Sequence, residues 1–330
     1  MTNKVLVTGS NGFLGSYIVE EAIKYNYNVF AGVRKSSDLT YLQNPKINFL
    51  YFSFEEEENL REQLRSHHFE YIILNAGVTN AKNKEIYYKI NASYNRKLCK
   101  ILIEENVIPK KLILISSLAS YGPADYQVKQ ILDKESVPHP VTWYGESKLQ
   151  AEQFIDSFSK IPSIILRPTA VFGPRDKDMV EVYKSINMHL EPKVGFGKQD
   201  MSFIYVKDLA RLIVSTLESK AKNKSYFVSD GKVYPSDEFY GIIANTLGKK
   251  TLKFTIPIGA MKLIALISEG IGKVRGHYPI LNRNKIKEYF ARSFAVDTTD
   301  IKNDFNFVPE FTLEEGLKET INWCKKNKLL

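Results

Sequence analysis

The amino-acid sequence predicts an α/β protein: a doubly wound parallel sheet followed by a smaller, mostly helical C-terminal domain. Three observations predict this fold. Short apolar runs alternate with segments of helical periodicity through the first half of the chain. Each apolar run is hydrophobic almost throughout, as expected for strands that helices cover on both faces. A glycine-rich turn joins the first apolar run to the first helical segment.

Periodicity and run length place the elements of this sheet. Strands are expected at residues 4–8, 29–33, 47–52, 71–74, 111–115 and 163–166. Helices are expected between them at residues 16–24, 55–66, 86–105 and 144–160. Because strands alternate with helices along most of this region, neighbouring strands are expected to run parallel.

The pattern changes after Pro168, where turn-rich stretches appear. Further strands are expected at 202–206 and 225–228, and further helices at 208–219, 235–247 and 312–325. The last helix starts with Thr312-x-x-Glu315, a capping-box pattern. We therefore predict one domain at residues 1–172, to which 202–230 returns. Residues 173–201 and 231–330 are expected to form a second, smaller domain.

The glycine-rich turn has the spacing of a phosphate-binding loop. Gly9, Gly12 and Gly15 form G-x-x-G-x-x-G, and Asn11, Phe13 and Leu14 lie between them. Glycine permits a tight turn and close approach of a diphosphate, and a helix N-terminus offers that anion free N–H groups. The turn therefore predicts a dinucleotide site, against the alternative of a merely structural turn.

The end of the second strand distinguishes between the two nicotinamide dinucleotides. An acidic residue at this position binds the ribose 2′-hydroxyl of NAD, whereas arginine accommodates the 2′-phosphate of NADP. The sequence continues Val33-Arg34-Lys35-Ser36-Ser37, with no carboxylate before Asp38. Arg34 and Lys35 therefore favour NADP(H) over NAD(H).

Tyr144 and Lys148 are the candidate acid/base pair. Residues four apart on a helix lie one turn above one another, so the hydroxyl and the ammonium can share a pocket. A phenol titrates near ~10 in water, and a neighbouring cation favours its ionised form. An exposed helical pair is the competing interpretation, because the chain has 19 tyrosines.

Four motifs occur in order along the chain. They are the glycine turn, Ser116-Ser117 after the fifth strand, Tyr144-x-x-x-Lys148, and the stretch from Arg167 to Pro174. With these motifs the chain resembles the extended short-chain dehydrogenase/reductases, also called the NAD-dependent epimerase/dehydratase family. Its C-terminal half, with Gly195-Phe196-Gly197 and Thr320-Ile321-Asn322-Trp323, is similar to the 3β-hydroxysteroid dehydrogenase-like and dihydroflavonol reductase-like branch.

The resemblance implies that the first domain is a dinucleotide-binding Rossmann domain and the second a substrate-binding domain. It also assigns roles to residues. Tyr144 is expected to be the acid/base, and Lys148 to lower its pKa and bind the nicotinamide ribose. Ser117 is expected to orient the substrate oxygen, with Ser116 and Ser120 as alternatives. Further cofactor contacts are implied at Ser53, Phe54, Asn75, Ala76, Gly77, Ser116, Pro168, Thr169, Ala170 and Val171. Substrate contacts are implied at Thr79, Ser117, Tyr121 and Arg175, and Asn91 is expected to be structural.

The resemblance leaves several functions open. The first is hydride transfer between nicotinamide and a ketone or secondary alcohol of a lipophilic, sterol- or lipid-like substrate. The alternative is a nucleotide-sugar epimerase or dehydratase with tightly bound NAD(P). A non-catalytic cofactor-binding scaffold is a second alternative, although a binding role needs no tuned phenol.

The composition of the chain indicates which kinds of partner and cellular compartment to expect. The chain of 330 residues has a net charge of +9 and two cysteines, Cys99 and Cys324, so we expect no disulfide framework, no metal site and a cytoplasmic protein. The lysines are scattered and no nucleic-acid module is evident. The apolar stretch 258–271, which carries Lys262, could be a buried helix, line a substrate tunnel or contact a membrane peripherally. The resemblance also implies a homodimer.

Overall fold

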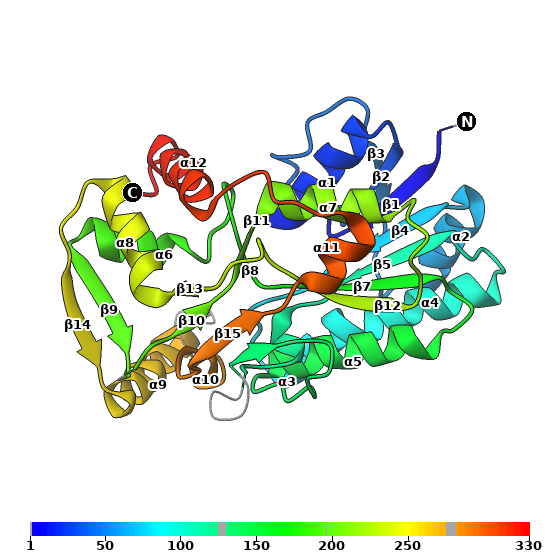
Figure 1. Ribbon diagram of the computed structural model, residues 1–330. Coiled ribbons are helices and arrows are strands. Elements are labelled where there is room, and N and C mark those ends of the chain that lie inside the picture. Colours follow the sequence, from blue (N-terminus) through cyan, green and yellow to red (C-terminus); the bar gives the residue numbers. More distant parts are fainter. Residues whose placement is uncertain (1, 125–129, 196, 275–281) are drawn as a thin grey trace.

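The computed structural model describes residues 2–124, 130–195, 197–274 and 282–330, so Phe196 of the 195–197 motif lies outside the described residues. The chain forms a sheet-containing lobe and a smaller lobe beside it (Figure 1). Strands β1 (Lys4–Thr8), β2 (Asn28–Val33), β3 (Asn48–Tyr51), β4 (Tyr71–Leu74), β5 (Lys111–Ile115), β7 (Ser163–Pro168) and β12 (Lys224–Val228) make the larger sheet.

This sheet is entirely parallel, in the order β12-β7-β5-β4-β1-β2-β3. The chain builds outward from β1 through β2 to β3 and then crosses to β4 on the other side of β1. Such a reversal opens a crevice at the carboxyl ends of the central strands, where doubly wound proteins bind ligands. The predicted fold class is confirmed.

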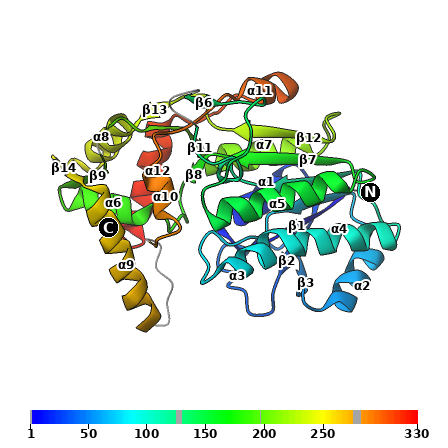
Figure 2. The same ribbon diagram turned by 90° about the horizontal axis from the view of Figure 1, so that it is seen from below.

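Helices cover both faces of the sheet (Figure 2). Helices α1 (Phe13–Lys24) and α7 (Val206–Thr216) pack on one face, and α2 (Glu57–His67), α4 (Tyr94–Glu104) and α5 (Trp143–Ser157) on the other. Within β1, Val5 and Val7 point to the first face while Leu6 points to the second, and all three are completely buried. Each such side chain stabilises the fold by about 1.5–3 kcal/mol.

The long helix expected at 86–105 contains an irregular turn. It is observed as α3 (Lys84–Tyr88), a π-helical turn η1 (Lys89–Ser93) and then α4. The turn carries Asn91, which is completely buried. Its amide exchanges hydrogen bonds with the backbone of Val78 (2.8 and 3.1 Å) and donates to Ser147 Oγ (2.9 Å). Asn91 thus ties the loop after β4 to α5, which agrees with the structural role expected for it.

The smaller lobe is mostly helical. Its elements are α6 (Val180–Asn187), β9 (Leu190–Val194), β10 (Asp200–Met201), β13 (Tyr234–Pro235), α8 (Ser236–Leu247), β14 (Leu252–Ile256), α9 (Ile258–Val274), α10 (Ile286–Tyr289), β15 (Ser293–Val296) and α12 (Leu313–Lys326). The remaining elements are strands β6 (Ile131–Leu132), β8 (Ala170–Phe172) and β11 (Phe203–Tyr205), the 3₁₀ turn η2 (Leu118–Ser120) and helix α11 (Thr299–Phe305). The predicted capping box of α12 is confirmed, since Thr312 and Glu315 cap each other.

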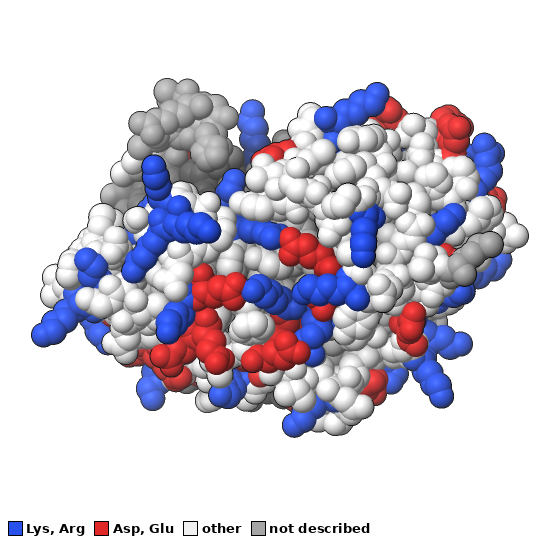
Figure 3. Space-filling view, turned by 90° about the horizontal axis from the view of Figure 1, so that it is seen from above, with Lys and Arg blue, Asp and Glu red and all other residues white. Residues whose placement is uncertain are grey.

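Lys and Arg side chains are scattered over the face shown in Figure 3. Asp and Glu side chains lie among them, most densely near the junction of the two lobes. That face therefore offers nucleic acid no continuous basic surface, which is the property such a partner requires.

Candidate active site

A cavity of about 840 Å³ lies between the two lobes, at the carboxyl ends of β1, β2, β4 and β5. The larger lobe contributes the glycine turn and the residues that follow the strands. The smaller lobe contributes residues before α6 and around α10. The cavity thus occupies the position that the reversal of strand order predicts for a ligand.

The glycine turn fits a dinucleotide diphosphate. Gly9 has a φ of +65°, and a Cβ there would lie 2.7 Å from the Ala76 Cα. A Cβ on Gly15 would overlap the Gly9 carbonyl oxygen, so this glycine lets α1 start close against the turn. No side chain caps the start of α1, and Phe13 and Leu14 of its first turn line the cavity. Free N–H groups at a helix start are suited to bind an anion.

The loop after β4 is fixed against this turn. Thr8 Oγ1 accepts hydrogen bonds from the backbone N–H groups of Asn75 and Ala76, each at 3.0 Å. Asn75 Nδ2 donates to the Gly9 carbonyl at 3.2 Å. Asn75, Ala76 and Gly77 line the cavity, as does Asn11 on the other side of the turn. The two loops therefore form one continuous wall.

Arg34 lines the cavity at the end of β2, whereas its neighbour Lys35 does not. The Arg34 side chain is exposed, and its backbone is held by a turn with Ser37 (3.1 Å from Arg34 N to Ser37 Oγ). The nearby carboxylate of Asp38 is occupied by the backbone and hydroxyl of Thr40. Ser53 and Phe54, which follow β3, also line the cavity.

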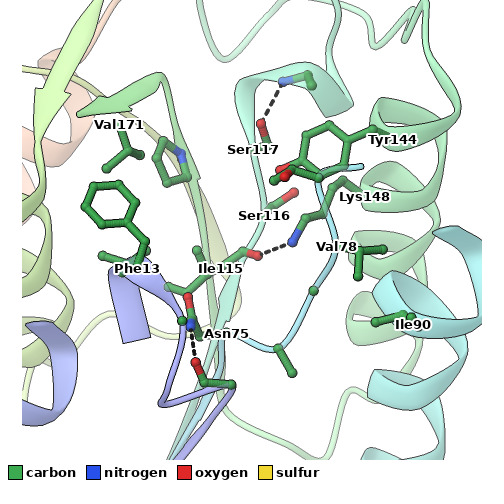
Figure 4. A pocket seen from close by; sticks show the side chains of 18 of the residues that line it. Phe13, Asn75, Val78, Ile90, Ile115, Ser116, Ser117, Tyr144, Lys148 and Val171 are labelled. Carbon is green, nitrogen blue, oxygen red and sulfur yellow. Dashed lines mark hydrogen bonds between the residues drawn. The ribbon is translucent and has the colours of Figure 1, made fainter. Parts of the chain in front are cut away.

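Ser117, Tyr144 and Lys148 meet on one side of the cavity, opposite Phe13 and Val171 (Figure 4). The Ser117 hydroxyl accepts a hydrogen bond from the Ala119 backbone N–H (3.1 Å) and is a neighbour of the Tyr144 hydroxyl. Lys148 Nζ lies 6.0 Å from the centre of the Tyr144 ring and donates to the Ile115 carbonyl at 2.8 Å. The two side chains therefore face the same space, as the helical spacing predicts.

The pKa of Tyr144 differs from the expectation. Burial raises it from 10.0 to about 12, and the neighbouring Ser117 hydroxyl offsets this rise only in part. Burial also lowers the pKa of Lys148 to about 8, although the charge of Glu152 opposes this shift. Burial is therefore the largest influence on the pKa of Tyr144, and it outweighs the lowering expected from Lys148.

The two alternative serines are already engaged. Ser116 donates to Glu152, whose other oxygen accepts two hydrogen bonds from Arg167, at 3.0 and 2.8 Å. Ser120 is completely buried and donates to the Ser117 carbonyl. Ser117 is thus the hydroxyl of the three that has Tyr144 as its neighbour.

The remaining predicted contacts divide into two groups. Pro168, Thr169, Ala170 and Val171 line the cavity, and so does Thr79. Tyr121 does not, because its ring packs against Arg167 (4.4 Å) in a separate apolar cluster with Phe227 of β12 and Val296 of β15. Arg175 does not either: it lies over the Tyr17 ring and pairs with Glu20 of α1 at 2.7 Å.

Sequence patterns did not reveal several residues that contact the start of α5. Thr142 caps that helix by accepting from Gly145 N (3.2 Å), and its hydroxyl donates to Glu288 Oε1 (2.9 Å). Asn284 Oδ1 accepts from Trp143 N (2.9 Å). The smaller lobe therefore holds the turn that carries Tyr144. A threonine just before the helix was the one available signal.

The model of the NAD-dependent epimerase/dehydratase family matches residues 5–229, more than half of the chain. The chain belongs to this family. It is therefore an NAD(P)-dependent enzyme of the extended short-chain dehydrogenase/reductase type, whose relatives are epimerases, dehydratases and dehydrogenases.

Relatives of the family match the chain over nearly its full length. UDP-glucose 4-epimerase of Vibrio cholerae is 28% identical, over 97% of this chain and 95% of that protein. N-acetyl-alpha-D-glucosaminyl-diphospho-ditrans,octacis-undecaprenol 4-epimerase of Escherichia coli O157:H7 is 25% identical, over 98% and 96%. Sterol-4-alpha-carboxylate 3-dehydrogenase, decarboxylating, of Dictyostelium discoideum is 23% identical, over 96% and 99%.

Solved structures of the family share the fold. The crystal structure of UDP-glucose 4-epimerase from Thermotoga maritima, determined with UDP-glucose, has a TM-score of 0.79 and 22% identity, covering 98% of this chain and 99% of that one. Among the described residues of our protein, no helix is long and apolar enough to cross a membrane. The same residues contain no cluster of His, Cys, Asp or Glu that could hold a metal ion.

Proposed function

We propose that the protein is an epimerase of a diphosphate-linked sugar. The observation that carries the proposal is a group of polar side chains around Tyr144 and beyond it, in the smaller lobe, which lie among apolar ones such as Met179, Met201 and Phe294. Polar side chains there are Thr79, Thr142, Asp176, Asp178, Asn284, Lys285 and Glu288. Carboxylates, amides and hydroxyls match the hydroxyl groups of a sugar, whereas a sterol needs an apolar pocket.

The relatives support the same substrate class. Two of the three named above are 4-epimerases, and their sugars are carried on a nucleotide or a lipid diphosphate according to their names. The sequence alone favours a lipophilic alcohol or ketone as the substrate. With the relatives considered, this hypothesis becomes the second candidate.

In the proposed reaction each residue has a limited task. A bound nicotinamide dinucleotide supplies the hydride acceptor and, when oxidised, a positive charge in the cavity. Ser117 would hydrogen-bond the sugar oxygen, and Tyr144 would remove its proton as the carbon is oxidised to a ketone. When the ketone is reduced again from its other face, Tyr144 would return the proton to the oxygen, which inverts the centre. Lys148 adds a second cation beside the phenol.

The raised pKa of Tyr144 fits this scheme. With a pKa of about 12, the phenol is protonated at neutral pH and can donate to a ketone oxygen. Removing a proton from an alcohol requires the phenolate, which an added positive charge favours. We therefore propose that Lys148 alone does not ionise Tyr144, and that the positive charge of a bound oxidised cofactor would be needed as well.

Incubation with a panel of UDP-hexoses and a catalytic amount of cofactor tests the proposal. We expect conversion to the C4 epimer with no net change in nicotinamide absorbance. Tyr144→Phe should slow turnover ~10²–10⁴-fold, the usual contribution of a general acid/base. Stoichiometric consumption of NADPH with a keto-lipid, and no epimer, would overturn the assignment.

Net oxidation or reduction of a lipophilic alcohol or ketone is the second candidate. Arg34 at the end of β2 favours NADP(H), the cofactor of reductive reactions, and the sterol dehydrogenase relative supports this class. We propose NADP(H) as the cofactor in either case. We also propose a cytoplasmic homodimer, which sedimentation analysis would test.

A further inference from the structure

Helix α9 exposes a row of large apolar side chains. Its inner face is buried through Met261 and Ala265. On its outer face, Leu263, Ile264, Leu266 and Ile267 have between 43% and 57% of their surface exposed. Figure 2 shows α9 extending from the smaller lobe away from the sheet. Apolar side chains that gather on one exposed face commonly mark a contact surface.

The charges around this face favour an anionic partner. On residues 258–270 and 282–289, the basic side chains are Lys262, Arg283, Lys285 and Lys287, and the acidic ones are Glu269 and Glu288. Glu269 is paired with Arg283 at 2.8 Å, and Glu288 accepts from Thr142. No carboxylate among the described residues pairs with Lys262, which is exposed beside the apolar row. An apolar row with a neighbouring unpaired cation is typical of helices that lie in a membrane interface.

The apolar row lies one helix away from the cavity. Met261 and Ala265 of α9 pack against Ile286 of α10. On either side of Ile286, Lys285 and Glu288 line the cavity. A surface that α9 contacts would therefore be close to the substrate half of the cavity.

We propose that the outer face of α9 docks on an anionic membrane surface and that the sugar is carried there by a membrane lipid diphosphate. The second part rests on the proposed epimerase function, and the first does not. A second copy of the chain fits the face less well. A stable dimer buries about 800 Å² on each partner, whereas this row is one helix wide.

Vesicle flotation tests the docking without any substrate. The full-length protein is mixed with vesicles of phosphatidylcholine alone, or of phosphatidylcholine with phosphatidylglycerol, at low and high salt. We expect flotation with the anionic vesicles at low salt. Lys262→Glu and the double variant Leu263→Ser/Ile267→Ser should each reduce the bound fraction about tenfold or more. Val308→Ser, which changes another exposed apolar residue (62% exposed), is the matched control and should float like the wild type.

Three outcomes overturn the docking: no flotation of the wild type, equal flotation of the double variant, or self-association in sedimentation that the double variant abolishes. Circular dichroism of each variant confirms that it is folded. Turnover then tests the substrate part. The double variant should keep wild-type turnover of a UDP-sugar but lose turnover of the sugar on vesicle-bound polyprenyl diphosphate. If the double variant loses turnover equally on both substrates, or keeps wild-type turnover on both, the sugar is not carried on a membrane lipid. Neither outcome changes the conclusion from flotation.

Discussion

Replacing Lys148 by methionine should change stability in a way that depends on pH. Burial lowers the pKa of Lys148 from 10.5 to about 8. The unfolded chain therefore holds this proton up to a higher pH than the folded protein does. Because one pKa unit corresponds to about 1.4 kcal/mol, the charged side chain costs the folded state about 3 kcal/mol at neutral pH. That cost diminishes as the pH rises from 8 toward 10.5.

Lys148→Met removes this cost but also leaves the Ile115 carbonyl without its 2.8 Å hydrogen bond. The lost bond destabilises by about 1–3 kcal/mol and is nearly independent of pH. The pH dependence of the difference between variant and wild type therefore isolates the charge. We subtract the free energy of unfolding of the wild type from that of the variant. We expect this difference to be about 2 kcal/mol larger at about pH 7 than at about pH 10.

Urea unfolding followed by fluorescence and circular dichroism measures this difference. Equal m-values for variant and wild type would show that both expose the same surface on unfolding. Lys160→Met, at an exposed lysine near the end of the same helix, is the control and should show no such pH dependence. If the Lys148→Met difference were the same at both pH values, Lys148 would not be a desolvated cation. The physical account of the site would then be refuted.

Three further changes give distinct results. Arg34→Ala should weaken NADPH binding about 10-fold or more while changing NADH binding much less, because it removes a charge-assisted contact; equal losses in calorimetry contradict the NADP(H) assignment. Gly15→Ala should abolish cofactor binding, since its Cβ would overlap the Gly9 carbonyl; an unchanged Kd would show that the turn does not bind the diphosphate. Glu288→Gln should keep the contact with Thr142 and leave KM near the wild-type value. Glu288→Ala loses this contact and should reduce kcat. If the two variants have equal kcat, Glu288 does not position Tyr144.

The sheet could be predicted because its strands are buried on both faces. Strands such as β1 and β5 are apolar at every position inside the sheet, and this pattern needs no tertiary information. The glycine turn and the Tyr144–Lys148 spacing are local as well. The π turn at Asn91 was not predictable, because its buried amide partners lie in a distant loop and in α5.

The substrate half of the cavity depends on contacts that no local pattern encodes. Glu288 reaches Thr142 across the two lobes from a segment without a motif. Arg175, expected at the substrate, has a φ of +76° and turns toward Glu20 instead. The rise in the pKa of Tyr144 was not predictable, because the spacing of two residues indicates the neighbouring charge but not the depth of burial.

Isotope tracing at the inverted carbon tests the central claim most directly. Sugar deuterated at C4 and carried on UDP would be incubated with the wild type and with Tyr144→Phe, and the products analysed by mass spectrometry. Our account predicts that the wild type returns an epimer that keeps its deuterium, while Tyr144→Phe forms ~10²–10⁴-fold less of it. Transfer of the label to exchangeable cofactor, or wild-type turnover by the variant, would contradict it.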